Sequence, residues 1–258
     1  MQGAVIDLDG TVYRSTDPVP DVPETVETLR DRGVDIIFAS NTSTKSRATC
    51  QRRLRNIGIA AEREEILTSA SVTAKHVATT YEGQRVFAVG SAALFGELAD
   101  AGIQTTDDPQ AAEAIVVGKD RDIDWEGLTR VVRAAVRDVP FVATNRDRVS
   151  PTSSGIVPGT GTLVAAVAWA ANREPDTVTG KPHDPMIDAI AERLDCELSE
   201  AFVIGDNIES DIALGERAGM PTVLVLSGVA AESDLDDAST QPTHVLDSLA
   251  DVERFFTV

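Results

Sequence analysis

Short apolar runs alternate with segments of helical length along most of the chain. Strands are predicted where apolar residues predominate, at residues 4–8, 34–39, 85–89, 114–117, 141–144, 201–204 and 222–226. Helices are predicted at about 22–32, 44–57, 92–101 and 125–137, and several of them end near a glycine. Because these strands are largely apolar on both faces, helices are expected on both sides of the sheet. The pattern is typical of an α/β fold with a mostly parallel sheet.

The alternation starts again in the middle of the chain, which indicates one domain inserted into another. We expect the insertion at about 81–177, between two halves of a discontinuous core at 1–80 and 178–258. Within the insertion, residues 150–161 are rich in Ser, Pro and Gly and predict a loop.

The composition is that of an ordinary globular protein, with 258 residues, 42% hydrophobic and 25% charged. No basic segment precedes the first apolar run, and the longest apolar run, 163–171, is far shorter than the ~20 residues that span a bilayer. Cys50 and Cys196 are isolated, which argues against a disulfide framework and a thiolate metal site. These features predict a cytoplasmic protein.

The charge balance is strongly acidic. Asp and Glu number 42 against 23 Lys and Arg, for a net charge of -19. A field of that sign repels nucleic acid and anionic membranes, so neither is expected as a partner. The acids are dispersed, and only four of the basic residues are lysines. Few lysines and many carboxylates suggest a halophilic protein, in which salt screens the self-repulsion.

The clearest candidate for chemistry is the run Asp7-Leu8-Asp9-Gly10-Thr11 at the end of the first predicted strand. Residues two apart on a strand point to one face, so both carboxylates could address one ligand. Gly10 leaves the backbone free to turn away. Paired carboxylates are useful when one is ionised beside a metal and the other stays protonated as an acid. The Asp-x-Asp spacing alone fits a helix-capping strand end equally well.

Three further motifs follow in the order seen in the haloacid dehalogenase (HAD) superfamily, whose first motif this run resembles. Ser40 closes the second predicted strand, as the Ser or Thr of the second motif does. Lys181, in Gly-Lys-Pro, matches the Lys of the third. The acidic loop Gly205–Asp211, with Asp206, Glu209 and Asp211, matches the fourth. Four matches in order are much more specific than any one of them.

The arrangement of a core interrupted by an insertion resembles HAD hydrolases of class IIA. It implies a Rossmann-like, mostly parallel sheet core with an inserted α/β C2-type cap. The sequences around Asp7, Ser40 and Asn145 are similar to the NagD / 4-nitrophenylphosphatase-like group. That group often has Thr-Asn-Asn at the second motif, whereas this chain has Ser40-Asn41-Thr42. Ser keeps the hydroxyl group, so phosphate binding is expected to survive.

The resemblance implies a Mg²⁺ site. Its ligands would be the Asp7 carboxylate, the Asp9 backbone carbonyl and the Asp206 carboxylate. Asp211 and Asn207 would hold these ligands in position without contacting the ion themselves.

The resemblance also implies the catalytic roles. Asp7 would attack phosphorus to form an aspartyl-phosphate. Asp9 would protonate the leaving group and then activate water. Ser40, Asn41 and Lys181 would bind the phosphate, with Ser40 and Lys181 counted among the catalytic residues.

These expectations describe a Mg²⁺-dependent phosphatase acting on small phosphorylated metabolites. A phosphotransferase on the same scaffold is one alternative. A non-catalytic regulatory binding protein is another, although the presence of Asp9 and Lys181 argues against it. Asn145–Arg148 could face the substrate or form a solvated loop. Caps of this type often take part in dimers in the resembling family, so a homodimer is one possible assembly. Trp125 and Trp169 are expected to be packing groups.

Overall fold

The computed structural model describes residues 1–14, 17–152 and 155–255, and the chain divides into two compact units. The core unit comprises Met1–Ser40, Arg47–Leu67 and Lys181–Val258. The inserted unit comprises Asn41–Ser46 and Thr68–Gly180. The insertion expected at 81–177 falls inside the inserted unit, which also takes in the preceding helix and a short loop after Ser40.

The core unit is built on a six-stranded sheet in the order β14-β13-β12-β1-β4-β5. Its central strand β1 pairs in parallel with β12 on one side and β4 on the other. Strand order therefore reverses at β1, the kind of position where open α/β sheets bind ligands. The strands are β1 (Gly3–Ile6), β4 (Asp35–Ser40), β5 (Ile66–Thr68), β12 (Ala201–Gly205), β13 (Thr222–Val225) and β14 (His244–Leu246).

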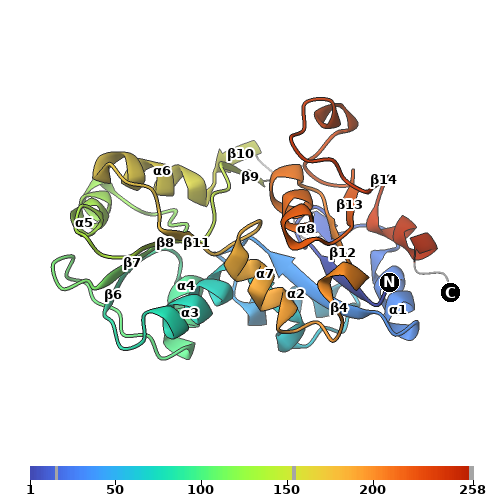
Figure 1. Cartoon of the computed structure of the whole chain (residues 1–258), viewed down its shortest axis with the longest axis horizontal. Helices are drawn as coiled ribbons and strands as arrows, with labels where there is room; N and C mark the ends of the chain where they lie inside the picture. Colours follow the sequence, from blue (N-terminus) through green and yellow to red (C-terminus); the bar gives the residue numbers. More distant parts are fainter. Residues whose placement is uncertain (15–16, 153–154, 256–258) are drawn as a thin grey trace. The chain divides into compact units, whose positions relative to one another are not determined.

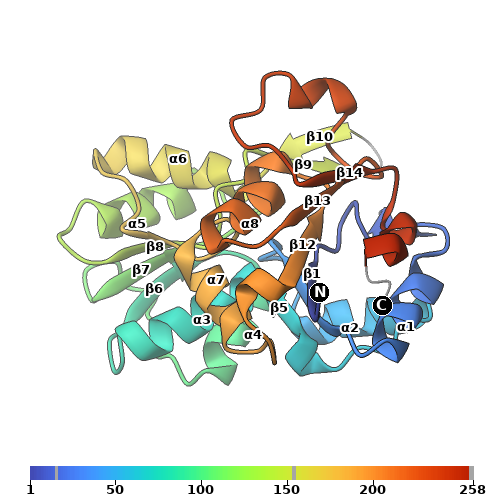
Figure 2. The same cartoon turned by 45° about the vertical axis from the view of Figure 1, so that its right-hand side comes forward.

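Helices cover this sheet as the apolar strands require. The α-helices are α1 (Val22–Asp31), α2 (Arg47–Asn56), α7 (Asp184–Ala191) and α8 (Ala213–Ala218). The 3-10 helices are η1 (Arg63–Glu65), η2 (Leu198–Glu200), η4 (Glu232–Leu235) and η5 (Leu249–Phe255), and η3 (Ile208–Ile212) is a π-helix. Helix α1 buries Val22, Val26 and Leu29 at helical spacing in the main core. It lies beside η5 from the opposite end of the chain (Figure 2).

A small hairpin follows β1 in the core unit. It pairs β2 (Tyr13–Arg14) with β3 (Asp17–Pro18) in antiparallel fashion. The Tyr13 ring is among the largest fully buried side chains, at 1% exposure. The hairpin is therefore anchored in the core by one aromatic residue.

The inserted unit has a four-stranded parallel sheet in the order β11-β8-β7-β6. Helices α3 and α4 pack on one face and α5 and α6 on the other (Figure 1). The strands are β6 (Val86–Val89), β7 (Ala114–Val117), β8 (Phe141–Ala143) and β11 (Thr177–Val178). The helices are α3 (Ser69–Thr80), α4 (Ala92–Asp100), α5 (Trp125–Ala135) and α6 (Thr160–Ala171).

The stretch 150–161, predicted as a loop, contains much of a second hairpin. Strands β9 (Val149–Thr152) and β10 (Gly155–Pro158) pair in antiparallel fashion. Strand β10 is mostly exposed, so it has no buried face that would impose an alternating pattern on the sequence. The loop prediction is wrong for these residues, because alternating apolar and polar residues indicate only those strands that have one buried face.

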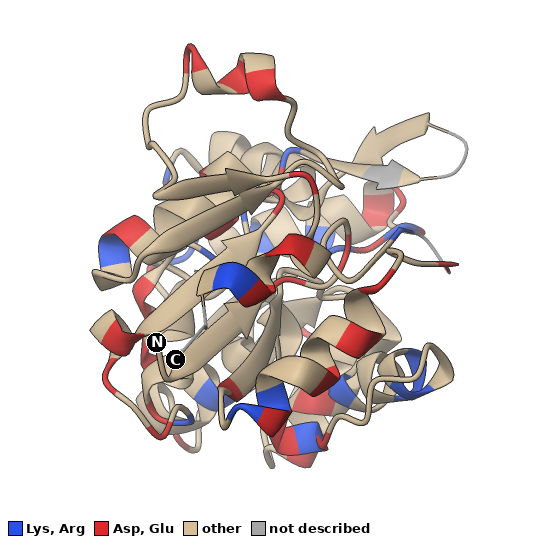
Figure 3. Ribbon diagram, turned by 90° about the vertical axis from the view of Figure 1, so that its right-hand side faces the viewer, with Lys and Arg blue, Asp and Glu red and all other residues tan. Residues whose placement is uncertain are grey.

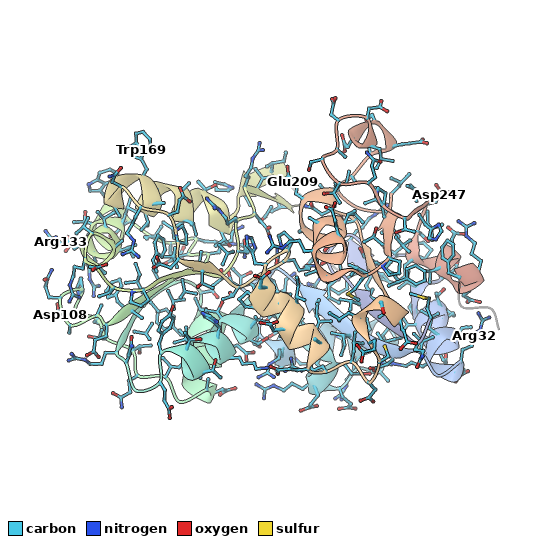
Figure 4. All side chains as sticks on the ribbon, in the orientation of Figure 1. Arg32, Asp108, Arg133, Trp169, Glu209 and Asp247 are labelled. Atoms are coloured by element: carbon cyan, nitrogen blue, oxygen red, sulfur yellow. The ribbon has the colours of Figure 1, made fainter. Side chains whose placement is uncertain are left out.

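The prediction that both tryptophans are packing groups is wrong. Trp125 is 81% exposed and Trp169 is 90% exposed. Helix α6 buries Val164, Val167 and Ala168, and Trp169 lies one position beyond this face and projects away from the helix (Figure 4).

Acidic residues lie on helices and loops throughout the ribbon (Figure 3). This spread agrees with the expectation that the acids are not gathered in a tail. Within the described ranges, every helix is too short or too polar to cross a lipid bilayer.

Candidate active site

Three carboxylates converge at the edge of the core sheet where the central strands end. Asp7 directly follows β1, and Asp206 directly follows the neighbouring strand β12. Asp211 lies in η3, one turn after Asp206. Oxygen atoms of the three carboxylates lie within 4.8 Å of one another, and Asp206 and Asp211 are almost fully buried. The parallel register of β1 and β12 therefore brings together two residues almost 200 positions apart.

Lys181 places its ammonium group in the same cluster. Its Nζ lies 2.5 Å from Asp7 Oδ1 and 2.7 Å from Asp211 Oδ1. It also donates a hydrogen bond of 2.7 Å to the carbonyl oxygen of Ala39, next to the end of β4. Lys181 is 3% exposed, so this cation is held in a dry environment.

The electrostatics of the cluster favour further positive charge. Burial raises the pKa of Asp7 well above its usual range; Lys181 opposes this, whereas Asp211 and Asp206 add to it. Burial and the Asp211 carboxylate raise the pKa of Asp206 to about 7. Burial lowers the pKa of Lys181, but Asp211 and Asp7 outweigh it and raise that pKa overall. One ammonium group faces three carboxylates, and a divalent cation would make up the difference.

Two glycines allow the backbone to close around Asp206. Gly10 has a φ of 106°, and a Cβ built on Gly10 or on Gly228 would overlap the Asp206 carboxylate. The amide of Val229 donates to Asp206 Oδ2 at 2.7 Å, and the Ser227 hydroxyl donates to the Gly10 carbonyl at 2.7 Å. The sequence carried no clear signal for Gly228, because its contact with Asp206 is formed only by folding.

The residues present fit a hard divalent cation. Mg²⁺ prefers carboxylate and carbonyl oxygens, and the cluster of Asp7, Asp206 and Asp211 is made of carboxylates. Asp211, expected only as a supporting residue, lies in the cluster itself. The Asn207 amide donates to Asp211 Oδ2 at 3.1 Å, and its side-chain Oδ1 caps η3 by accepting hydrogen bonds from the amides of Glu209 and Ser210.

Asp9 lies outside this buried cluster. Strand β1 ends at Ile6, and the amides of Val12 and Tyr13 both donate to the Leu8 carbonyl, so Asp9 is in a tight turn. The argument from strand alternation therefore does not describe it. Its side chain is 45% exposed and lies 3.6 Å from the guanidinium group of Arg53. Nothing in the sequence pattern singled out Arg53.

The two candidates of the second motif fall in different units. Ser40 is the last residue of β4 in the core unit and is 3% exposed. Asn41 belongs to the inserted unit, where its Nδ2 donates to Asp147 Oδ1 at 2.9 Å. Its carbonyl accepts a 2.8 Å hydrogen bond from Asn145 Nδ2. The polar run after β8 is thus tied to the loop of the second motif, a link that sequence reasoning missed.

Two family models match this chain. Residues 4–104 match a model described as haloacid dehalogenase-like hydrolase, and residues 178–252 match a second, HAD-hydrolase-like model. The unmatched middle lies within the inserted unit.

Relatives and solved structures match over nearly the whole chain. The sugar-phosphatase AraL of Bacillus subtilis is 34% identical, with 98% of this chain and 92% of the relative covered. The 5'-nucleotidase YutF of the same organism is 32% identical, with 97% and 96% covered. The p-nitrophenyl phosphatase from Archaeoglobus fulgidus superposes with a TM-score of 0.94 at 37% identity, with 98% of each chain covered. NagD from E. coli K-12 superposes with a TM-score of 0.88 at 27% identity, with 97% and 98% covered.

Proposed function

This chain belongs to the haloacid dehalogenase-like hydrolases, in their NagD-like phosphatase branch, and we propose that it hydrolyses small phosphate monoesters through a covalent aspartyl-phosphate on Asp7. The observation that carries the proposal is the contact of Lys181 with Asp7 beside two further buried carboxylates. A buried carboxylate held by an ammonium group at the edge of a sheet is suited to attack on phosphorus.

In this mechanism Asp7 Oδ attacks the phosphoryl group in line, the ester bond breaks, and the phosphoryl group is transferred to Asp7. Lys181 orients the nucleophile and neutralises charge on the phosphoryl oxygens, where most of the catalysis of phosphoryl transfer resides. Mg²⁺, held by Asp7, Asp206 and the Asp9 carbonyl with Asp211 close by, would supply further positive charge to the same oxygens.

Asp9 is proposed as the general acid and base. Its side chain is 45% exposed and lies outside the carboxylate cluster, where a leaving group could approach it. It would donate a proton to the departing alkoxide and later take one from the water that attacks the aspartyl-phosphate. The Ser40 hydroxyl and the Asn41 amide are proposed to bind the transferring phosphoryl group.

The substrate class is proposed from the relatives. AraL is named as a sugar phosphatase and YutF as a 5'-nucleotidase. We expect an alkyl phosphate of comparable size, a sugar phosphate or a nucleotide, with the inserted unit restricting which of them binds.

Release of phosphate from 4-nitrophenyl phosphate tests the reaction. The wild-type protein should be active with Mg²⁺ and inactive after chelation by EDTA, and Asp7→Asn should lose at least roughly 10³-fold in kcat. Acid-quenched protein should carry one labile phosphate on Asp7. Equal activity of wild type and Asp7→Asn would reject the covalent mechanism. Transfer of the phosphoryl group to an added alcohol in preference to water would indicate the phosphotransferase alternative.

We also propose that the protein works in high salt, because its charge of -19 is spread over the chain. Salt screens this self-repulsion. Circular dichroism should show cooperative folding in concentrated KCl and loss of structure on dialysis to low ionic strength. A melting temperature independent of salt would reject the proposal.

A further inference from the structure

Arg53 lies beside Asp9, in the turn after β1, and Tyr13, in β2. Its guanidinium group lies 3.6 Å from Asp9 Oδ1 and stacks over the Tyr13 ring, with 3.9 Å between Cζ and the ring centroid. Arg53 belongs to α2, some forty residues further along the chain. Folding alone brings the three side chains together.

The position of Arg53 is defined both by its own helix and by the Tyr13 ring. Its helix is anchored by Cys50 and Leu54, which are both completely buried. Arg53 follows Cys50 by three residues, so it lies on the neighbouring part of the same helix face. The Tyr13 ring beneath it is 1% exposed and cannot move without disturbing the core. The guanidinium group is therefore held between a rigid ring and a carboxylate.

This arrangement suits the chemistry of arginine. A guanidinium group stacks on an aromatic ring with its flat face while its N–H groups still point outward in its own plane. The stack over Tyr13 thus leaves the N–H donors directed at the side, where Asp9 lies. The stacking keeps the guanidinium group beside the Asp9 carboxylate.

We propose that Arg53, stacked on Tyr13, is a positioning residue that holds the Asp9 carboxyl group in place for proton transfer to the leaving group. The inference rests on the proposed function, in which Asp9 is the general acid. A partly exposed ion pair contributes little to stability, so the main effect is expected on the geometry of Asp9. Displacing a reacting group by a fraction of an ångström already slows catalysis.

Two substrates with different leaving groups separate positioning from a general structural role. An alkyl phosphate such as glycerol phosphate releases a strongly basic alkoxide, which needs a proton from Asp9 as the ester bond breaks. 4-Nitrophenolate is a stable anion and departs with little help from an acid. Since kcat/KM reports the steps up to leaving-group departure, a displaced Asp9 should lower it mainly for the alkyl phosphate.

The test compares Arg53→Gln with the matched control Arg52→Gln. Arg52 is on the same helix and exposed, and the hydrogen bond seen for its guanidinium group goes to Thr49 Oγ1 at 3.1 Å. Arg53→Gln should lower kcat/KM for glycerol phosphate roughly ten-fold and for 4-nitrophenyl phosphate by less than about two-fold. Arg52→Gln, which removes the same charge, should leave the ratio of the two values unchanged. Arg53→Lys, which keeps a cation near Asp9 but loses the flat stack on Tyr13, should give a ratio between those of wild type and Arg53→Gln.

A loss of equal size on both substrates, or no loss, would overturn the inference. So would an Arg53→Lys ratio as low as that of Arg53→Gln, because the cation would then not act on Asp9. Melting curves of all variants should agree within a few degrees. A wild-type protein inactive on both substrates would overturn the proposed function itself and this inference with it, whereas an active wild type with an unchanged ratio in Arg53→Gln overturns the inference alone.

Discussion

The two parallel sheets of this protein carry very different residues beyond their carboxyl ends. In the core unit the central strands are followed by Asp7 and Asp206, buried and in a cluster with the cation of Lys181. In the inserted unit β8 is followed by Asn145, which is equally buried but neutral, and its amide hydrogen-bonds to the Asn41 carbonyl. Similar strand topology thus supports charge in one unit and neutral hydrogen bonding in the other.

The difference indicates that the two units have separate roles. Burying charges is costly, and the raised pKa of Asp7 and of Asp206 reflects that cost. Such a cluster is retained where the charges act on a ligand. A neutral amide that satisfies two backbone groups has a low cost and orders the loops around it. We therefore expect the chemistry in the core unit and the shaping of loops in the inserted unit.

The largest effect should come from exchanging one lysine in each unit for methionine. Lys181→Met leaves buried carboxylates without their cation, and we expect a loss of at least roughly 10²-fold in kcat/KM and about 3–5 kcal/mol in stability. Lys119, after β7, donates to Ser150 Oγ at 2.9 Å and is half-buried, so Lys119→Met should cost about 1 kcal/mol or less. Activity assays and urea denaturation measure both. Similar losses in the two variants would contradict the separation of roles.

The second-largest effect is expected in how the free energy of unfolding of the metal-free protein depends on pH. Asp206 has a pKa of about 7 in the folded protein, above its value of about 4 in an unfolded chain. The folded state therefore binds the proton more tightly, and the free energy of unfolding falls as pH rises from about 4 to about 7. In EDTA the protein should be roughly 2 kcal/mol more stable at pH 5.5 than at pH 8.

Mg²⁺ and one variant sharpen this measurement. Mg²⁺ favours the ionised carboxylates, so it should stabilise the protein more at pH 8 than at pH 5.5. Asp206→Asn cannot ionise and should reduce the pH dependence in EDTA. If wild type and Asp206→Asn gave the same stability profile, Asp206 would not be its source.

The smallest effect is expected in the inserted unit. Asn145→Ala leaves the Asn41 carbonyl and the Asp147 amide without the Asn145 side chain, which should cost about 1–3 kcal/mol. The exposed Trp169 offers a control, because Trp169→Ala should change stability by less than about 0.5 kcal/mol. Thermal melts compare the two. Equal destabilisation would show that the hydrogen bonds of Asn145 do not order this region.

Local features were predictable because they leave a mark on neighbouring residues. The strand around Val5 and the helix starting at Val22 follow from runs and spacings of apolar side chains, which record burial directly. The motif residues Asp7, Lys181 and Asp206 could be named because the short motifs around them resemble, in order, those of the HAD superfamily.

The sequence by itself thus determined the α/β class and the order of its main elements, and its resemblance to the HAD superfamily indicated Asp7, Asp206 and Lys181 as site residues. Only the tertiary structure decided that Asp211 joins that cluster, that Gly228 closes on Asp206 and that Arg53 meets Asp9. The physical reason is the separation along the chain between the residues that come into contact. Periodicity records which side of an element is buried, whereas these contacts join distant segments whose distances depend on how the sheet and helices pack.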